Sequence, residues 1–299
     1  RRVEHSMISI FAAALFTLAT KQEMVVSSEW LNAHLNDPLV AVVEVGDRAD
    51  YDAGHIPGAR FVAREEVVTD CDGLPNELPS DDALVATFTR AGVGDWKRIV
   101  VYSRDPLLAA RTWFTLDYLG HGYRASVLDG GFAKWTADRR QVSTAKMSLL
   151  PTPFTVATRP FSVVKFDSMR ALVRNRSHSN IVMIDARPSL NFSGEMAGSG
   201  VKRRGHIPGA VNVPWTANLT SDPPHVLRDP EALRQMYDSA GVTQETAVVT
   251  YCRTGMEATM TYFVLRYLGY DVALYDGSFI EWSASPDTMV ARSDGIEPR

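Results

Sequence analysis

Short apolar runs alternate with helical patterns along most of the chain. The runs end at polar or turn residues, which is typical of buried strands in a parallel sheet. Four such runs are predicted strands: residues 40–45, 99–102, 181–184 and 247–251. After the last run, a helical stripe comprises Ala258, Tyr262, Leu265 and Leu268, and Gly269 follows as its C-cap. This alternation predicts the α/β class, with parallel sheets covered by helices on both faces.

The pattern occurs twice along the sequence. The segment GHIPGA stands at residues 54–59 and again at residues 205–210. In each copy a second matching block follows, and the two blocks align Ser103 with Cys252. The repeat is too long for a solenoid unit, so it predicts two copies of one domain. We expect a first domain at 24–140, a Pro-containing linker at 141–160 and a second domain at 161–290.

Residues 7–20 form an uncharged, mostly apolar run, with Arg1 and Arg2 before it and Lys21 after it. The run is short for a membrane span but fits the apolar part of a secretory signal. We therefore expect residues 1–23 to be either a signal peptide or an N-terminal extension. The first case implies an exported or periplasmic protein and the second a cytoplasmic one. No later segment could span a bilayer, so no membrane association of the mature form is expected.

Charge and cysteine content narrow the possible partners. The 31 basic and 35 acidic side chains give a net charge of −4, so the chain has no overall attraction for nucleic acid. Any anion that it binds must be held by a local cluster. The two cysteines, Cys71 and Cys252, are far apart, and no Cys/His cluster has zinc-ligand spacing. We expect neither a disulfide framework nor a metal site.

Cys252 is the candidate nucleophile, because it stands between a predicted strand and a predicted helix. Unpaired backbone N–H groups at the helix start should stabilise its thiolate, so its pKa is expected below the usual value of about 8.5. Gly255 would let the loop curl around the sulfur, and Arg253 adds a cation. A buried structural cysteine is the alternative, and we assign that role to Cys71. The predicted active-site loop is Cys252, Arg253, Thr254, Gly255, Met256, Glu257 and Ala258.

These features resemble the two-domain rhodanese family, the thiosulfate and 3-mercaptopyruvate sulfurtransferases. The resemblance is carried by the two GHIPGA boxes, a Cys-Arg-x-Gly loop in the second copy alone, and the DGG and DGS turns followed by Trp135 and Trp282. It implies an inactive first domain, a catalytic second domain and an active site between them. Ser103 replaces the nucleophile in the first copy, and its loop lacks the glycine.

The resemblance also implies the chemistry. The Cys252 thiolate would attack the outer sulfur of thiosulfate, release sulfite and hold a persulfide, from which cyanide or a thiol would then remove the sulfur. This cycle needs no cofactor. The expected partners are therefore a small-molecule donor and acceptor, and we expect a monomer.

The choice of donor is predicted from departures from the family pattern. Mercaptopyruvate enzymes typically carry a glycine after the cysteine, an Asp after the first GHIPGA box and paired arginines in the second domain. This chain has Arg253, Ala63 and Asn191 at those positions. We therefore predict thiosulfate, with 3-mercaptopyruvate as the alternative. The candidate substrate-binding residues are Arg253, Arg187 and Arg204.

Glu257 stands where the family usually has Thr or Ser, and a carboxylate there would raise the pKa of the thiol. We expect it to face the mouth of the cleft and to select the acceptor. His55 and His206 occur in both copies, including the one without a cysteine, so we interpret them as structural hydrogen-bonding residues. Trp215 is expected in the core or along the cleft.

A cysteine phosphatase and a non-catalytic persulfide carrier are the two alternative functions. A cysteine phosphatase needs an arginine at the end of its loop to bind phosphate with two hydrogen bonds, and Ala258 stands there. A non-catalytic carrier that passes a persulfide to a partner protein stays open.

Overall fold

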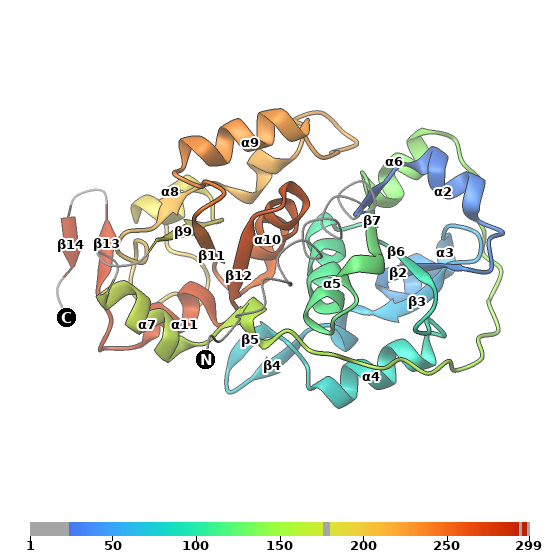
Figure 1. The fold of residues 1–299 in the computed structure, drawn as a ribbon, viewed down its shortest axis with the longest axis horizontal. Coiled ribbons are helices and arrows are strands. Elements are labelled where there is room, and N and C mark those ends of the chain that lie inside the picture. The colour runs from blue at the N-terminus through green and yellow to red at the C-terminus, as the bar shows by residue number, and fades with distance from the viewer. Residues whose placement is uncertain (1–23, 176–179, 293–294, 298–299) are drawn as a thin grey trace, which may run out of the picture.

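The computed structural model describes residues 24–175, 180–292 and 295–297. Residues 1–23, with the predicted signal peptide or extension, lie outside this range. The described chain folds into two α/β halves that follow one another in sequence, as Figure 1 shows. Each half contains a five-stranded sheet in which all strands are parallel. The predicted α/β class is confirmed.

Both sheets have the same strand order. The first has the order β1-β7-β6-β2-β3, and the second, taken from its opposite edge, has β8-β12-β11-β9-β10. The strands of the first are β1 (Val25–Val26), β2 (Val40–Gly46), β3 (Arg60–Ala63), β6 (Arg98–Tyr102) and β7 (Ala125–Leu128). Those of the second are β8 (Val163–Val164), β9 (Ile181–Asp185), β10 (Val211–Asn212), β11 (Ala247–Tyr251) and β12 (Asp271–Tyr275). All four predicted strands are present, each within one residue of its predicted ends.

Helices cover both faces of the first sheet, because alternate strand residues are apolar on either side. On one face, α2 (Ser28–His34), α3 (Arg48–Ala53) and α6 (Gly131–Ala137) pack against Val42 and Val100. On the other face, α4 (Asp81–Arg90) and α5 (Pro106–Tyr118) pack against Val43 and Val101.

The second sheet is covered in the same way. Helices α7 (Phe166–Arg174) and α11 (Ser278–Ala284) pack on the face that contains Val249 and Tyr251. Helices α9 (Pro230–Ser239) and α10 (Met256–Leu268) pack on the face that contains Val248. The short helix α8 (Ser189–Ser193) follows β9, and β13 (Val290–Arg292) pairs with β14 (Gly295–Glu297) after α11.

Helices α5 and α10, which are equivalent elements of the two copies, lie side by side between the sheets (Figure 1). Their aromatic side chains interlock, since Phe114 meets Tyr262 edge to face at 4.8 Å and Trp113 meets Phe263 at 5.0 Å. The Tyr262 hydroxyl also donates to Asp117, at 2.7 Å. One hydrophobic cluster consequently runs from the first sheet through both helices to the second sheet.

Each half also extends a segment over the other. In the first half this segment is the hairpin of β4 (Thr69–Cys71) and β5 (Leu74–Glu77). In the second it is the turn around the bridge between Leu219 and Leu227. The Leu78 amide donates to Asp276 at 3.0 Å, and the equivalent Leu227 amide donates to Asp129 at 2.9 Å. Each half therefore makes the same kind of contact with the other, as expected for two copies of one fold.

The connection between the halves follows the surface of the first one. Residues 144–159 form neither helix nor strand. Thr152 donates its amide to the carbonyl of Thr89, and Phe154 packs on Phe88 with ring centroids 5.1 Å apart.

A buried ion pair crosses between the halves. Arg111 of α5 donates from Nη1 to Oδ1 of Asp276, at 2.6 Å, and the side chains are 0% and 1% exposed. Asp276 follows β12, so the pair joins a helix of one half to the strand end of the other. Because water cannot reach these charges, each depends on its partner.

We expect Arg111→Met to destabilise the protein by about 3–5 kcal/mol, because it leaves the Asp276 carboxylate buried without its cation. The measurement is urea unfolding followed by circular dichroism. The matched control is Arg234→Met, which removes a solvent-exposed pair with Glu231 and should cost less than about 1 kcal/mol. Equal midpoints for the two variants would show that the buried pair does not stabilise the fold.

Candidate active site

Cys252 lies between the end of β11 and the start of α10, as the sequence predicts. Its amide donates to the Ser278 hydroxyl at 3.2 Å, and its carbonyl accepts from the Phe279 amide at 3.0 Å. The side chain is 1% exposed. The backbone of the cysteine is thus fixed by the segment that follows β12.

Gly255 lets the loop turn into the helix. Its φ is +84°, which a side chain would strain, and a Cβ there would lie 2.9 Å from Oδ1 of Asp276 and 3.3 Å from Nη1 of Arg111. The buried ion pair between the halves therefore sits directly against the loop. Only a residue without a side chain fits between them.

The pKa of the Cys252 thiol is raised to about 12. Burial is the largest cause, and the Glu257 carboxylate is the second. Hydrogen bonds from the amides of Ala258 and Thr254 act in the opposite direction, as expected at a helix start. The predicted amide cradle is therefore present, but the prediction that the pKa lies below its usual value is wrong, because burial and a neighbouring carboxylate outweigh the cradle.

Glu257 is half-buried in the first turn of α10 and lies beside the thiol. Burial raises its pKa, whereas Arg253 and a hydrogen bond with Cys252 lower it. The carboxylate thus interacts with both the thiol and the Arg253 guanidinium. Its expected role in selecting the acceptor stays a prediction.

The three candidate substrate-binding arginines lie in different surroundings. Arg253 is partly exposed, and its Nη1 donates to the carbonyl of Ser199 at 3.1 Å. Arg187 is 2% exposed and pairs with Asp185 at 2.5 Å, and it also donates to the Gly205 carbonyl. Arg204 is exposed. The structure thus brings Arg253 and Arg187 close to the thiol and leaves Arg204 on the surface.

The pKa of Arg187 is raised, although burial alone lowers it, because the Asp185 carboxylate and the nearby Cys252 favour the charged form. Asp185 ends β9 beside β11, at the carboxyl edge of the sheet where ligands of such folds bind. Its position at a strand end was the sequence signal for it, but its pairing with Arg187 was not predicted.

The first half contributes groups to the loop that sequence analysis missed. Asn76, at the end of the β4–β5 hairpin, donates from Nδ2 to the Thr254 hydroxyl at 3.1 Å. Its Oδ1 accepts from Arg64 at 2.7 Å. Because Asn76 and Thr254 are far apart in sequence, no local pattern could have shown this contact.

In the first copy, a carboxylate of the equivalent loop caps the helix that follows it. The Asp105 carboxylate accepts from the Leu107 amide at 2.9 Å and so occupies the start of α5. The Ser103 hydroxyl accepts from the Asp105 amide at 3.1 Å. Arg104 turns away and donates to the carbonyls of Asp50 and Gly54. This loop has a serine in place of the thiol, and its Asp105 and Leu107 amides are bonded within the loop.

The two box histidines make backbone contacts, in agreement with a structural role. Nδ1 of His55 lies 2.8 Å from the Tyr51 carbonyl, and Nδ1 of His206 lies 2.8 Å from the Phe192 carbonyl. Both rings also stack on those aromatic side chains. Trp215 is partly buried and packs against the core cluster.

The expectation that Cys71 is a buried structural cysteine is wrong. Cys71 ends the short strand β4 of the hairpin and is exposed.

The described residues contain no group of three or more His, Cys, Asp or Glu arranged to hold a metal ion. Among the helices of these residues, none has the length and apolar character needed to cross a bilayer.

This chain resembles known proteins in both sequence and fold. A family model described as Rhodanese-like domain matches residues 27–138 and 168–285. The sulfur carrier protein TtuD of Thermus thermophilus is 30% identical over 91% of this chain and 98% of its own length. The thiosulfate sulfurtransferase of Pseudomonas aeruginosa is 30% identical over 89% of this chain and 96% of its own.

Among solved structures, SseA from Escherichia coli, described with the 3-mercaptopyruvate sulfotransferases, matches with a TM-score of 0.75 and 29% identity. The match covers 85% of this chain and 98% of SseA. Two matched domains, two parallel sheets of equal strand order and a cysteine at the head of α10 give one conclusion. The chain belongs to the tandem rhodanese family and is a sulfurtransferase built from two rhodanese-like domains.

Proposed function

We propose that the protein transfers the outer sulfur of thiosulfate to cyanide or to a thiol through a persulfide on Cys252. The observation that carries this proposal is the position of the thiol at the head of α10, where the amides of Thr254 and Ala258 hydrogen-bond to it. Such amides stabilise negative charge on sulfur without rearranging during the reaction.

In the donor half-reaction, Cys252 loses its proton to solvent, and its sulfur attacks the outer sulfur of thiosulfate. The S–S bond of thiosulfate breaks, and sulfite leaves with the electron pair. The enzyme then holds an anionic persulfide, whose charge the same amides favour. In the second half-reaction, cyanide or a thiolate attacks the outer sulfur, and the Cys252 thiolate is restored.

The surroundings of the arginines support thiosulfate over 3-mercaptopyruvate. The Arg187 guanidinium is bound to Asp185, and position 191 holds a neutral asparagine that donates to the carbonyl of Met196 at 3.4 Å, so no pair of arginines is available there for a carboxylate. Arg253 is partly exposed beside the thiol and is the group that we assign to the dianionic donor. Arg204 on the surface is assigned a long-range attraction for the same anion.

A persulfide carrier is the second candidate function, and the similarity to the sulfur carrier protein TtuD supports it. The two functions share the persulfide and differ in turnover. Thiosulfate and cyanide should yield thiocyanate over many cycles with an enzyme. A carrier that serves a partner protein would form no more than one equivalent.

Treatment with thiosulfate should add one sulfur atom to the intact protein, as measured by mass spectrometry. Cys252→Ser should gain none and should lose thiocyanate formation down to the uncatalysed rate. Cys71→Ser is the matched control, because Cys71 is exposed, and it should behave as the wild type. If the Cys71→Ser variant failed to gain the sulfur atom, the persulfide would form on Cys71, and the assignment to Cys252 would be wrong.

Glu257→Gln should lower the pKa of Cys252, because it removes a carboxylate that raises it. The rate of iodoacetamide alkylation, measured against pH in a Cys71→Ser background, should therefore shift to lower pH. Below the pKa, the rate rises about tenfold for each unit by which the pKa falls. Glu245→Gln, on an exposed side chain, should leave the profile unchanged.

The same Glu257→Gln variant tests acceptor selection. Without the negative charge, the rate with a thiol that also bears a carboxylate, such as 3-mercaptopropionate, should rise more than the rate with 2-mercaptoethanol, which bears none. Unchanged rates for every acceptor would remove Glu257 from this role.

Arg253→Gln should lower kcat/KM for thiosulfate by about tenfold or more, because it removes a charged partner of the donor. Arg204→Gln should have a smaller effect that disappears at high salt. Arg234→Gln, remote from the loop, is the control. If wild-type kcat/KM were higher for 3-mercaptopyruvate than for thiosulfate, the donor assignment would be wrong while the persulfide chemistry would stand.

A further inference from the structure

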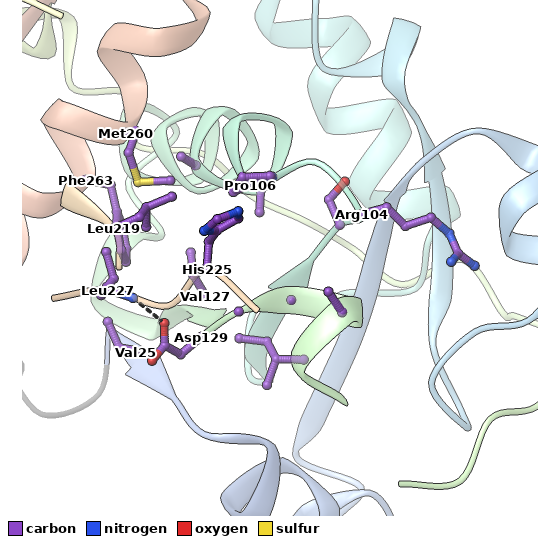
Figure 2. A pocket seen from close by; sticks show the side chains of 17 residues that line it. Val25, Arg104, Pro106, Val127, Asp129, Leu219, His225, Leu227, Met260 and Phe263 are labelled. Carbon is purple, nitrogen blue, oxygen red and sulfur yellow. Dashed lines mark hydrogen bonds between the residues drawn. The ribbon is translucent and has the colours of Figure 1, made fainter. Parts of the chain in front are cut away.

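A pocket between the two halves has no part in the chemistry above. Its cavity has a volume of about 100 Å³ and opens to solvent, and Figure 2 shows the side chains around it. Its walls are mostly apolar and come from both halves: Val25, Pro106, Val127, Leu219, Leu227, Met260 and Phe263. No residue of the loop 252–258 lines it. Apolar pockets at domain interfaces that contain a few polar groups are typical ligand sites.

The duplication of the chain shows what this pocket corresponds to. Asp129 lines it and follows β7, just as Asp276 follows β12 in the other half. Each carboxylate accepts a leucine amide from the opposite half, Asp129 from Leu227 and Asp276 from Leu78. The pocket beside Asp129 and the space beside Asp276 are therefore equivalent places in the two copies.

The equivalent places differ in one side chain. Arg111 of α5 fills the space beside Asp276 and binds that carboxylate through two nitrogens, at 2.6 and 3.4 Å. In the aligned blocks the residue of α10 that matches Arg111 is Met260, which lines the pocket and is apolar. The pocket is thus the space that an arginine side chain occupies in the other copy.

Asp129 consequently has no cation of its own. It makes no ion pair within the part of the chain that the structure describes, and the nearby Lys134 is bound to Asp138 at 2.5 Å. Burial raises the pKa of Asp129, although the amides of Leu227 and Gly130 and the charge of Lys134 act against this. A ligand cation beside Asp129 would stabilise the ionised form of its carboxylate.

The other polar groups at the pocket suit a cation with several N–H donors. Nδ1 of His225 lies 2.9 Å from the Thr220 carbonyl and must donate to it, so a neutral ring presents Nε2 as an acceptor. The His225 ring lies over the pocket in Figure 2. The Arg104 guanidinium points away and donates to the carbonyls of Asp50 and Gly54.

We propose that this pocket binds a small organic cation that has a guanidinium head and a short alkyl stem. The head would pair with Asp129 as Arg111 pairs with Asp276, and the stem would lie against Met260 and Phe263. A bound ligand would contact both halves at once.

The test uses the full chain and n-propylguanidinium, which has the atoms of an arginine side chain beyond Cα. Isothermal titration calorimetry compares it with n-propylurea, a neutral analogue of nearly the same shape. The guanidinium should bind at least about tenfold more tightly, because a charged hydrogen-bonded pair contributes that much. Equal binding of the two compounds, or no binding of either, would overturn the proposal.

Three variants locate the site. Asp129→Asn keeps an acceptor for the Leu227 amide but loses the charge, so affinity should fall by about tenfold or more. Asp82→Asn, the same change at an exposed position of α4, should have no effect. Met260→Arg supplies the missing guanidinium, so it should abolish binding and raise the unfolding temperature. If Asp129→Asn does not fold, Met260→Arg decides, and retained binding in that variant would contradict the proposal.

Discussion

The buried pair of Arg111 and Asp276 is the interaction on which the rest of the arrangement depends. It joins α5 of the first half to the end of β12 in the second, and it lies against Gly255 in the loop that presents Cys252. Burying two charges is costly, so the pair is stable only with short, well-directed contacts such as the one seen at 2.6 Å. The Cys252 loop of one half is consequently supported by a side chain of the other.

The thiol shows how burial and local backbone geometry compete. A helix start and two amide donors favour the thiolate, yet the side chain is 1% exposed and has a carboxylate as neighbour. The desolvation penalty acts on the whole charge, whereas each amide compensates only part of it. The resting protein therefore keeps the proton on sulfur.

Sequence reasoning succeeded where the signal was local or repeated. The four apolar runs identified strands, and the placement of Cys252 between a strand and a helix identified the loop. The duplication identified two domains of one fold. Sequence reasoning failed where contacts join distant residues. Nothing in the sequence near Asn76 shows that it reaches Thr254, and nothing near Arg111 shows that it pairs with Asp276. The pKa of Cys252 was misjudged for a related reason, since burial depends on what packs above a loop and the loop sequence does not contain that information.

The reciprocal contacts between the halves limit how modular the protein can be. Its two copies look like separable units, because each has a complete sheet with helices on both faces. The half that holds Cys252 would nevertheless lose Arg111, Asn76 and the aromatic partners of Tyr262 if it stood alone. Its Asp276 would then be a charge without a counter-ion, and the apolar side of α10 would face solvent. An autonomous single-copy version would thus need new residues at the places where the first half now supplies these contacts.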